Sequence, residues 1–207
     1  MTRYPPIRFP MSACPQIRQP VVFDLEYTAW PHSMARRWND PGEFREVIQI
    51  GAVKLDAHDW RETASFSLLL KPRINPVLST FIQDLTGVTN AMIAAHGIDF
   101  SQAHARFLEF AGGAPLVSFG RDDLVLAENA RVYGLRVAPL PPHVNIGPWL
   151  YRNGIDPRGY HACDVARLAG VALEGHGHDA LYDARSVAAG IRALAAKGAP
   201  SPLEEIP

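Results

Sequence analysis

The sequence predicts an α/β fold, in which helices cover the two faces of a mixed β-sheet. Two observations predict it. Three strand-like segments come first, and strand-like and helical segments alternate after them, an order typical of an α/β sandwich. The chain also has 207 residues, 47% of them hydrophobic and 20% charged, which is enough for one globular domain with a proper core. We therefore expect one domain over residues 20–198, between an extended N-terminal arm (1–19) and a C-terminal tail (199–207), both rich in proline.

The first three strands are predicted within residues 21–30 (VVFDLEYTAW) and at 47–55 and 65–70, where β-branched and large apolar residues dominate. A polar stretch, residues 31–44, separates the first two and is typical of a loop. No long helical pattern interrupts the three segments, so we expect them to form an antiparallel meander.

Helical periodicity dominates the rest of the chain. Short helices are predicted at 78–85 and 90–95, followed by an amphipathic helix that begins near Ser101. The stretch APLVSFG (114–120) reads as a short buried strand, and residues 122–133 as a helix closed by Gly134. Residues 136–148 are proline-rich and are expected to be irregular. A helix over 161–168 precedes the clearest one, which carries an apolar stripe from Ala180 to Leu194.

Composition excludes several classes of protein. The net charge of −1, from 20 basic and 21 acidic residues, argues against a nonspecific polycation, although a local basic groove remains open. Cys14 and Cys163 stand far apart and in no metal-binding spacing, so neither a disulfide framework nor a zinc site is indicated. Prolines interrupt the N-terminal residues where a signal peptide needs an apolar run, and no segment is long enough to span a membrane. We expect a cytoplasmic protein without a membrane partner.

Two carboxylates interrupt the first strand, in VVFDLEYTAW. Alternate residues of a strand share a face, so Asp24 and Glu26 point the same way as Val22. Two ionised groups at the edge of a core repel each other and lose hydration, and a bound divalent cation would compensate both effects. The alternative is that they lie beyond the end of the strand, paired with arginines.

Two further segments carry candidates for the same site. Asp183 flanks the apolar stripe of the last helix, and His178, five residues earlier, could overhang the same pocket as a general base. An isolated histidine in a glycine-rich loop could equally be a surface residue. In SFGRDDLVL, Asp122 and Asp123 follow a strand and a glycine, at the end of the sheet where α/β folds bind ligands. Either could simply cap the helix.

The order of these motifs resembles that of the DEDDh 3′-to-5′ exonucleases of the ribonuclease H-like superfamily, most closely the Eri-like and KapD-like groups. The resemblance covers residues 21 to about 190 and rests on FDLEYTAW, PGEFREVIQIGAV, KPRINPVLSTFIQDLTGVT, FGRDD and HDALYDA. It implies a ribonuclease H-like three-layer sandwich with a central five-stranded mixed sheet, and an exonuclease domain over residues 20–198. The DEDDy subgroup has a tyrosine in place of the histidine, four residues before the final aspartate. That position is Asp179 here, so the histidine version matches better.

The resemblance also implies the roles of the site residues. Asp24, Glu26, Asp123 and Asp183 would bind two divalent cations, Mg²⁺ or Mn²⁺, with His178 as the general base. Asp123 is preferred to Asp122 because the family places the acid three residues after the turn glycine, here Gly120. Two such cations can activate a water and stabilise the leaving 3′ oxygen of a phosphodiester. The expected reaction releases nucleoside 5′-monophosphates from the 3′ end of single-stranded RNA or DNA.

Contacts to the terminal nucleotide are implied for six residues. Tyr27, Thr28 and Trp30 follow the first strand, and Trp30 and Tyr27 could stack on a base; Leu85, Thr86 and Gly87 would wedge against it. RNA is favoured over DNA by an Asn145-Ile step similar to the Eri-like group, although Gly147 replaces a basic residue there. The alternatives are a DNA-directed exonuclease with the same residues and a catalytically silent nucleic-acid-binding module.

Overall fold

Five strands form the central sheet of the protein, whose structure is a computed structural model that describes residues 19–205. They are β1 (Val21–Tyr27), β2 (Val47–Leu55), β3 (Glu62–Leu69), β4 (Leu116–Ser118) and β5 (His143–Asn145). The order across the sheet is β3-β2-β1-β4-β5, with β1, β2 and β3 antiparallel and β4 and β5 parallel to β1. The predicted meander and mixed sheet are confirmed. The predicted N-terminal arm lies outside the described residues, except for residue 19.

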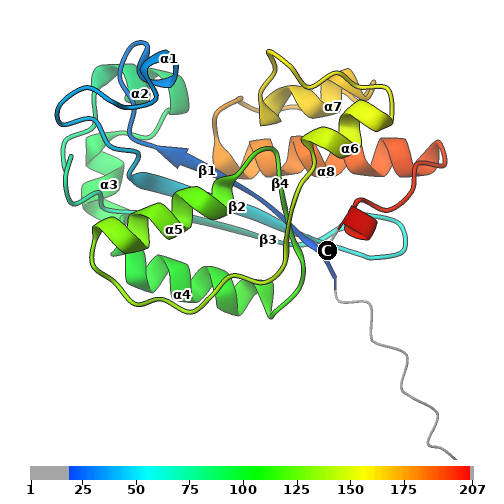
Figure 1. Cartoon of the computed structure of the whole chain (residues 1–207), viewed down its shortest axis with the longest axis horizontal. Helices are drawn as coiled ribbons and strands as arrows, with labels where there is room; N and C mark the ends of the chain where they lie inside the picture. The colour runs from blue at the N-terminus through cyan, green and yellow to red at the C-terminus, as the bar shows by residue number, and fades with distance from the viewer. Residues whose placement is uncertain (1–18, 206–207) are drawn as a thin grey trace, which may run out of the picture.

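Helices cover both faces of this sheet (Figure 1). They are α1 (Ser33–Arg36), α2 (Thr80–Thr86), α3 (Asn90–His96), α4 (Phe100–Ala111), α5 (Asp122–Val132), α6 (Gly147–Arg152), α7 (Val165–Leu168) and α8 (Ala180–Ala196), with 3₁₀ turns η1 (Ala162–Asp164) and η2 (Pro202–Glu205). Helices α4 and α5 pack on one face, and α6, α7 and α8 on the other. Among the described residues, no helix combines the length and apolar character that crossing a membrane requires.

The alternation of side chains along β1 divides the core in two. Phe23 packs into the cluster that contains Phe107 of α4, while Val22 packs into the cluster that contains Ile191 of α8. Asp24 and Glu26 continue the face of Val22 beyond the apolar part of that cluster. The alternation therefore turns both carboxylates toward α8.

Two segments differ from the structure that the sequence predicts. Within residues 136–148, which the sequence predicts to be irregular, residues 143–145 form β5 and residues 147–148 begin α6. Pairing with β4 makes Val144 a strand residue, and its side chain is buried in the core. The C-terminal segment is not an extended arm, because Pro202 is buried and the indole N–H of Trp149 donates to the Pro200 carbonyl at 3.0 Å.

Glu46, a fully buried carboxylate before β2, is satisfied by the chain itself. Its oxygens accept the backbone N–H groups of Arg73, Ile74 and Asn75 at 2.5–2.7 Å, and the Tyr133 hydroxyl at 2.6 Å. Charge-assisted hydrogen bonds of this kind compensate the loss of hydration. Glu46 thereby ties the loop that leads to α2 onto the sheet and onto the end of α5.

Gly51 of β2 lies opposite Asp24 and allows α8 to approach the sheet backbone. A Cβ atom at this position would stand 2.1 Å from the backbone N of Leu181 and 2.2 Å from the carbonyl carbon of Ala180. Backbone atoms cannot rotate away as a side-chain end can. Only glycine therefore permits the first turn of α8 to sit beside Asp24.

We expect Gly51→Ala to lower the free energy of unfolding by about 2 kcal/mol or more, because the added methyl group overpacks against backbone atoms. Urea denaturation of the purified variant measures the change. Ser65→Ala, on an exposed position of the neighbouring strand β3, is the matched control and should leave the midpoint nearly unchanged. An unaltered midpoint for Gly51→Ala would contradict the close approach.

Candidate active site

Four carboxylates line one cavity of about 690 Å³ at the carboxyl end of β1, where α5 and α8 begin. We call Asp24, Glu26, Asp122 and Asp183 the carboxylate cluster. The strand β1 supplies the first two, and the first turns of α5 and α8 supply Asp122 and Asp183. Because β1 and β4 run parallel, the carboxyl end of β1 and the turn from β4 into α5 meet at the same edge of the sheet.

Burial raises the pKa of every member of the carboxylate cluster. The pKa of Asp24 rises well above its usual range, first through burial and then through the charges of Asp122 and Asp183. Burial, with the charge of Asp183, raises the pKa of Glu26 to about 9. Burial raises the pKa values of Asp122 and Asp183 to about 7. The carboxylates therefore resist being charged together.

The chain supplies no compensating side-chain cation inside this cavity. No lysine or arginine is among the described residues that line it, and the buried Oδ2 of Asp122 has no hydrogen-bond partner. Glu26, His178 and Asp183 each offer a ligand atom, and these atoms lie within 4.8 Å of one another. Carboxylate oxygens are the donors that Mg²⁺ and Mn²⁺ prefer. The donor set thus fits a hard divalent cation.

His178 enters the cavity from the turn that precedes α8. Its backbone adopts a left-handed conformation, with φ of 65°, and its N–H donates to Asp183 Oδ1 at 3.2 Å. Burial, followed by the nearby His161 and His176, lowers the pKa of His178. The lowered pKa favours the neutral imidazole, which is the form that can accept a proton. The structure brings His178 to the carboxylate cluster, as the sequence predicts.

A second histidine, His161, lies against His178 and was not singled out by sequence reasoning. The two rings meet edge to face, with centroids 5.3 Å apart, and both line the cavity. His161 precedes η1 and reaches this position only because η1 and α7 pack on α8. No local pattern around residue 161 signals that proximity.

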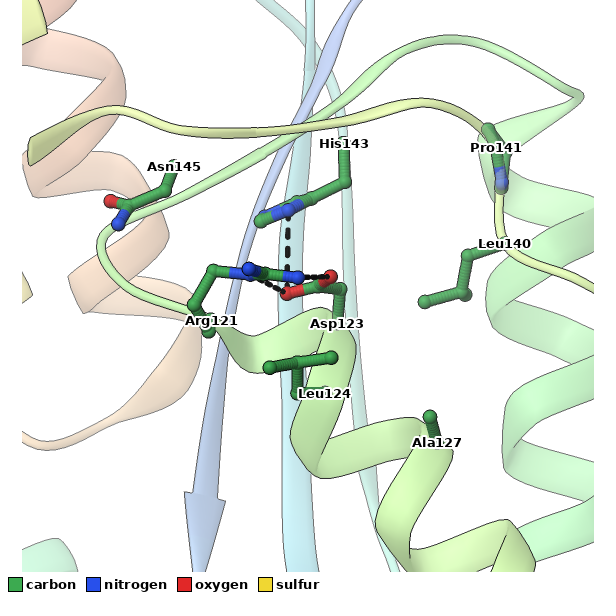
Figure 2. A pocket seen from close by; sticks show the side chains of 8 residues that line it. All are labelled: Arg121, Asp123, Leu124, Ala127, Leu140, Pro141, His143 and Asn145. Carbon is green, nitrogen blue, oxygen red and sulfur yellow. Dashed lines mark hydrogen bonds and ion pairs between the residues drawn. The ribbon is translucent and has the colours of Figure 1, made fainter. Parts of the chain in front are cut away.

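The structure places Asp122, and not Asp123, in the carboxylate cluster. Asp123 lines a separate cavity, where it accepts two hydrogen bonds from Arg121 at 2.8 and 2.7 Å and lies 3.4 Å from His143 Nδ1 (Figure 2). Successive residues of a helix point about 100° apart, so neighbours at the start of α5 face different cavities. Counting three residues from Gly120 led to Asp123 in the sequence. The direction in which the first turn of α5 presents its side chains instead places Asp122 in the cavity.

Three of the six residues expected to contact a nucleotide line the cavity, namely Tyr27, Trp30 and Leu85. The other three are not among its lining residues. The hydroxyl group of Thr28 donates to the Phe44 carbonyl and accepts the Glu46 N–H. The hydroxyl group of Thr86 donates to the Ile82 carbonyl and accepts the Val88 N–H. Gly87 ends α2 with φ of 73°.

The remaining wall of the cavity is largely apolar and was not predicted from the sequence. Trp38 packs edge to face on Tyr27, and its indole N–H donates to the Thr28 carbonyl at 3.0 Å. Other apolar side chains of the wall come from α1, α2, the turn after β4 and the loop before η1: Met34, Phe81, Phe119 and Tyr160. An apolar wall beside a carboxylate cluster can receive a flat ring next to a charged group.

Comparison with known proteins identifies relatives of this site. The sequence model of the RNase T family, described as exonuclease, matches residues 21–190. A search of curated protein sequences finds no match.

Solved structures share the fold. The nuclease domain of 3′hExo, a DEDDh family member bound to rAMP, is 20% identical with a TM-score of 0.75, covering 90% of this chain and 96% of that chain. Cell-death related nuclease 4 (CRN-4) is 18% identical with a TM-score of 0.72, covering 88% and 65%. Exonuclease X, in complex with 5′-overhanging duplex DNA, is 15% identical with a TM-score of 0.62, covering 90% and 96%.

The raised pKa values predict how pH affects the metal-free protein. A carboxyl group with a higher pKa in the folded than in the unfolded state contributes stability at low pH, and this contribution is lost as pH rises through the folded value. The stability contributed by protonated Asp122 and Asp183 is lost as pH rises through about 7. The contribution of protonated Glu26 is lost as pH rises through about 9. We therefore expect Glu26→Gln, which cannot ionise, to become progressively more stable than wild type between pH 6 and 9.

Melting temperatures in EDTA at pH 6, 7.5 and 9 measure this difference. Added Mg²⁺ or Mn²⁺ should raise the wild-type melting temperature most at pH 9, where the carboxylates are charged, and should raise that of Glu26→Gln less. A difference between the two proteins that does not change with pH would refute the repulsion within the carboxylate cluster.

Proposed function

Because this chain belongs to the RNase T exonuclease family, we propose that it removes nucleotides one at a time from the 3′ end of single-stranded nucleic acid, preferentially RNA, and releases nucleoside 5′-monophosphates. The family, the ribonuclease H-like fold and the enzyme class are those that the sequence predicts, and these predictions are confirmed. The observation that carries the proposal is the meeting of Asp24, Glu26 and Asp183 with His178 in one cavity.

The carboxylate cluster would hold two divalent cations, Mg²⁺ or Mn²⁺. Such cations neutralise the negative charge of the phosphodiester, activate a water and stabilise the departing 3′ oxygen. Glu26 and Asp183 lie beside His178 and would share a cation on the side of the attacking water. Asp24 is exposed to the charges of both Asp122 and Asp183 and would join them in holding the cations. Asp122 replaces Asp123 in the ligand set proposed from the sequence.

His178 acts in this proposal as the general base. The water oxygen attacks the phosphorus, and the water proton passes to a ring nitrogen of His178. The bond between phosphorus and the 3′ oxygen breaks. That oxygen takes up a proton from solvent and becomes the 3′ hydroxyl of the shortened strand, and the phosphate leaves on the product as a 5′-monophosphate. Asp183 accepts the His178 backbone N–H and His161 lies against the ring, so both restrict the imidazole near the carboxylate cluster.

Tyr27, Trp30 and Leu85 would bind the terminal base, together with the wall formed by Trp38 and Phe81. Stacking of a base on an aromatic ring is worth about 1–3 kcal/mol and tolerates any base. The preference for RNA is supported by 3′hExo, which was solved with rAMP, and by its higher TM-score than that of Exonuclease X, which was solved with duplex DNA. A cytoplasmic location stays a prediction from composition.

We expect the purified protein to shorten a 5′-labelled RNA strand in single-nucleotide steps from the 3′ end with Mg²⁺ or Mn²⁺, and to stop in EDTA. A DNA strand of the same sequence should be shortened more slowly. Asp24→Asn should lose at least about a hundredfold of the activity because the central carboxylate is removed, while its melting temperature does not fall.

The two strands also separate the alternatives. Faster shortening of DNA would identify a DNA-directed exonuclease. Metal-dependent binding of the strand without release of mononucleotide would identify a silent binding module and would overturn the proposed hydrolysis.

A pair of variants tests which of the tandem aspartates belongs to the carboxylate cluster. We expect Asp122→Asn to lose activity at every metal concentration, because Asp122 faces the cavity. Asp123→Asn should keep activity at saturating metal, because Asp123 faces the separate cavity. The readout is initial rate against Mn²⁺ concentration for both variants. The reverse pattern would restore Asp123 as the ligand.

A further inference from the structure

A second cavity, of about 540 Å³, lies at the start of α5 and is lined by Asp123, the neighbour of Asp122 (Figure 2). Its polar lining comes from Arg121 and Asp123 at the start of α5 and from His143 and Asn145 of β5. These groups are already engaged with one another, since Asp123 accepts two hydrogen bonds from Arg121 and contacts His143. These polar side chains therefore bond to one another, and we do not assign them to a ligand.

His143 stands at the centre of these contacts. Its Nδ1 lies 3.4 Å from Asp123 Oδ1, and its Nε2 lies 2.9 Å from the hydroxyl oxygen of Ser118 on β4. The ring is nearly buried and packs edge to face on Phe23 of β1, with centroids 5.9 Å apart. We call Ser118, His143 and Asp123 the β4–β5 bridge, because it joins the ends of these strands to α5.

The β4–β5 bridge contains the three side chains of a serine-hydrolase triad, but it cannot act as one. Ser118 is fully buried, so no substrate carbonyl can reach its hydroxyl. A nucleophile must approach the reacting atom to within about 3 Å. The bridge therefore has a structural consequence and no nucleophilic role.

That consequence concerns the turn from β4 into α5. The Ser118 hydroxyl donates to the Gly120 carbonyl at 3.3 Å, and Asn145 Oδ1 accepts the Gly120 N–H at 3.0 Å. Gly120 itself adopts φ of 120°. Residues 118–123 are thus held at both ends, by Ser118 and by Asp123, and Asp122 lies between these two contacts.

Ser118 connects His143 to this turn. Its single hydroxyl proton goes to the Gly120 carbonyl, and its oxygen lies 2.9 Å from His143 Nε2. Burial raises the pKa of Asp122, and the neighbouring Ser118 opposes that increase. One buried hydroxyl thus links the imidazole of the second cavity to the turn that carries Asp122.

We propose that His143 is a positioning residue for metal binding, which acts through Ser118 and Asp123 to aim the Asp122 carboxylate into the carboxylate cluster. This inference rests on the proposed function, in which Asp122 is a metal ligand. Partners that orient a ligand in this way commonly change metal affinity by about 10–100-fold when they are replaced. The tandem aspartates then have separate tasks: Asp122 binds, and Asp123 fixes the direction of Asp122.

The test uses His143→Phe and Ser118→Ala in the full chain. Phenylalanine keeps a ring against Phe23 but removes both ring nitrogens, and alanine removes the bridging hydroxyl. Leu124→Ala, an exposed residue of the second cavity, is the matched control. Mn²⁺ binding is measured by calorimetry on the metal-free proteins, together with melting temperature and the Mn²⁺ concentration that gives half-maximal exonuclease rate.

We expect both bridge variants to bind Mn²⁺ about tenfold more weakly and to recover the wild-type rate at saturating Mn²⁺, while Leu124→Ala binds as wild type. Wild-type Mn²⁺ affinity in His143→Phe and Ser118→Ala, even with a lowered melting temperature, would overturn the inference and leave the proposed function intact. Failure of the proposed function is recognised separately, by a wild-type protein that releases no nucleotide. Asp122→Asn retaining activity would remove Asp122 from the ligand set, and would overturn the inference while the exonuclease function stands.

Discussion

The repulsion among four buried carboxylates that share one cavity is the constraint on which the rest of this structure depends. Each ionised group removed from water costs on the order of several kcal/mol unless an opposite charge or hydrogen-bond donors replace the water. The described residues lining the cavity include no lysine or arginine, and one oxygen of Asp122 lacks any partner. Glu46 shows that the chain can satisfy a buried carboxylate when only stability is required. Carboxylates that are left without a cationic partner in a cavity are typical of a site that binds cations.

The fold brings these charges together from three distant parts of the chain. The period of β1 sends Asp24 and Glu26 to the face of α8, and Gly51 removes the side chain that would keep α8 away. The parallel pairing of β1 with β4 delivers the start of α5 to the same edge. None of these contacts is local, so the cavity exists only when the whole sheet is formed.

Sequence reasoning predicted the elements whose pattern is local and missed those that depend on a tertiary partner. The meander and α8 are predicted by their own periodicity. Asp24 and Glu26 lie on the same face of β1 in the structure, as the sequence predicts. In contrast, β5 becomes a strand because β4 pairs with it, and η2 forms because Trp149 offers a donor to the end of the chain. Proline content alone suggested irregular structure in both places.

Within the site, the differences are ones of orientation. A fixed offset from Gly120 led to the turn before α5 and to Asp123, whereas the structure turns the neighbouring Asp122 into the carboxylate cluster, because one step along a helix redirects a side chain by about 100°. Thr28 and Thr86 are themselves among the residues predicted to contact the nucleotide, yet backbone groups occupy their hydroxyls. His161 could not be found without knowing that η1 and α7 pack on α8.

The hydrogen bonds of Glu46 have a consequence for the mobility of the cavity wall. They anchor residues 73–75, at the root of the segment that leads into α2, to the edge of the sheet. Phe81 and Leu85, at the cavity itself, lie several residues beyond that anchor on α2, whose Ile82 and Thr86 are buried. The wall is therefore fixed both at residues 73–75 and along the buried side of α2, so an incoming strand meets a surface that is already formed.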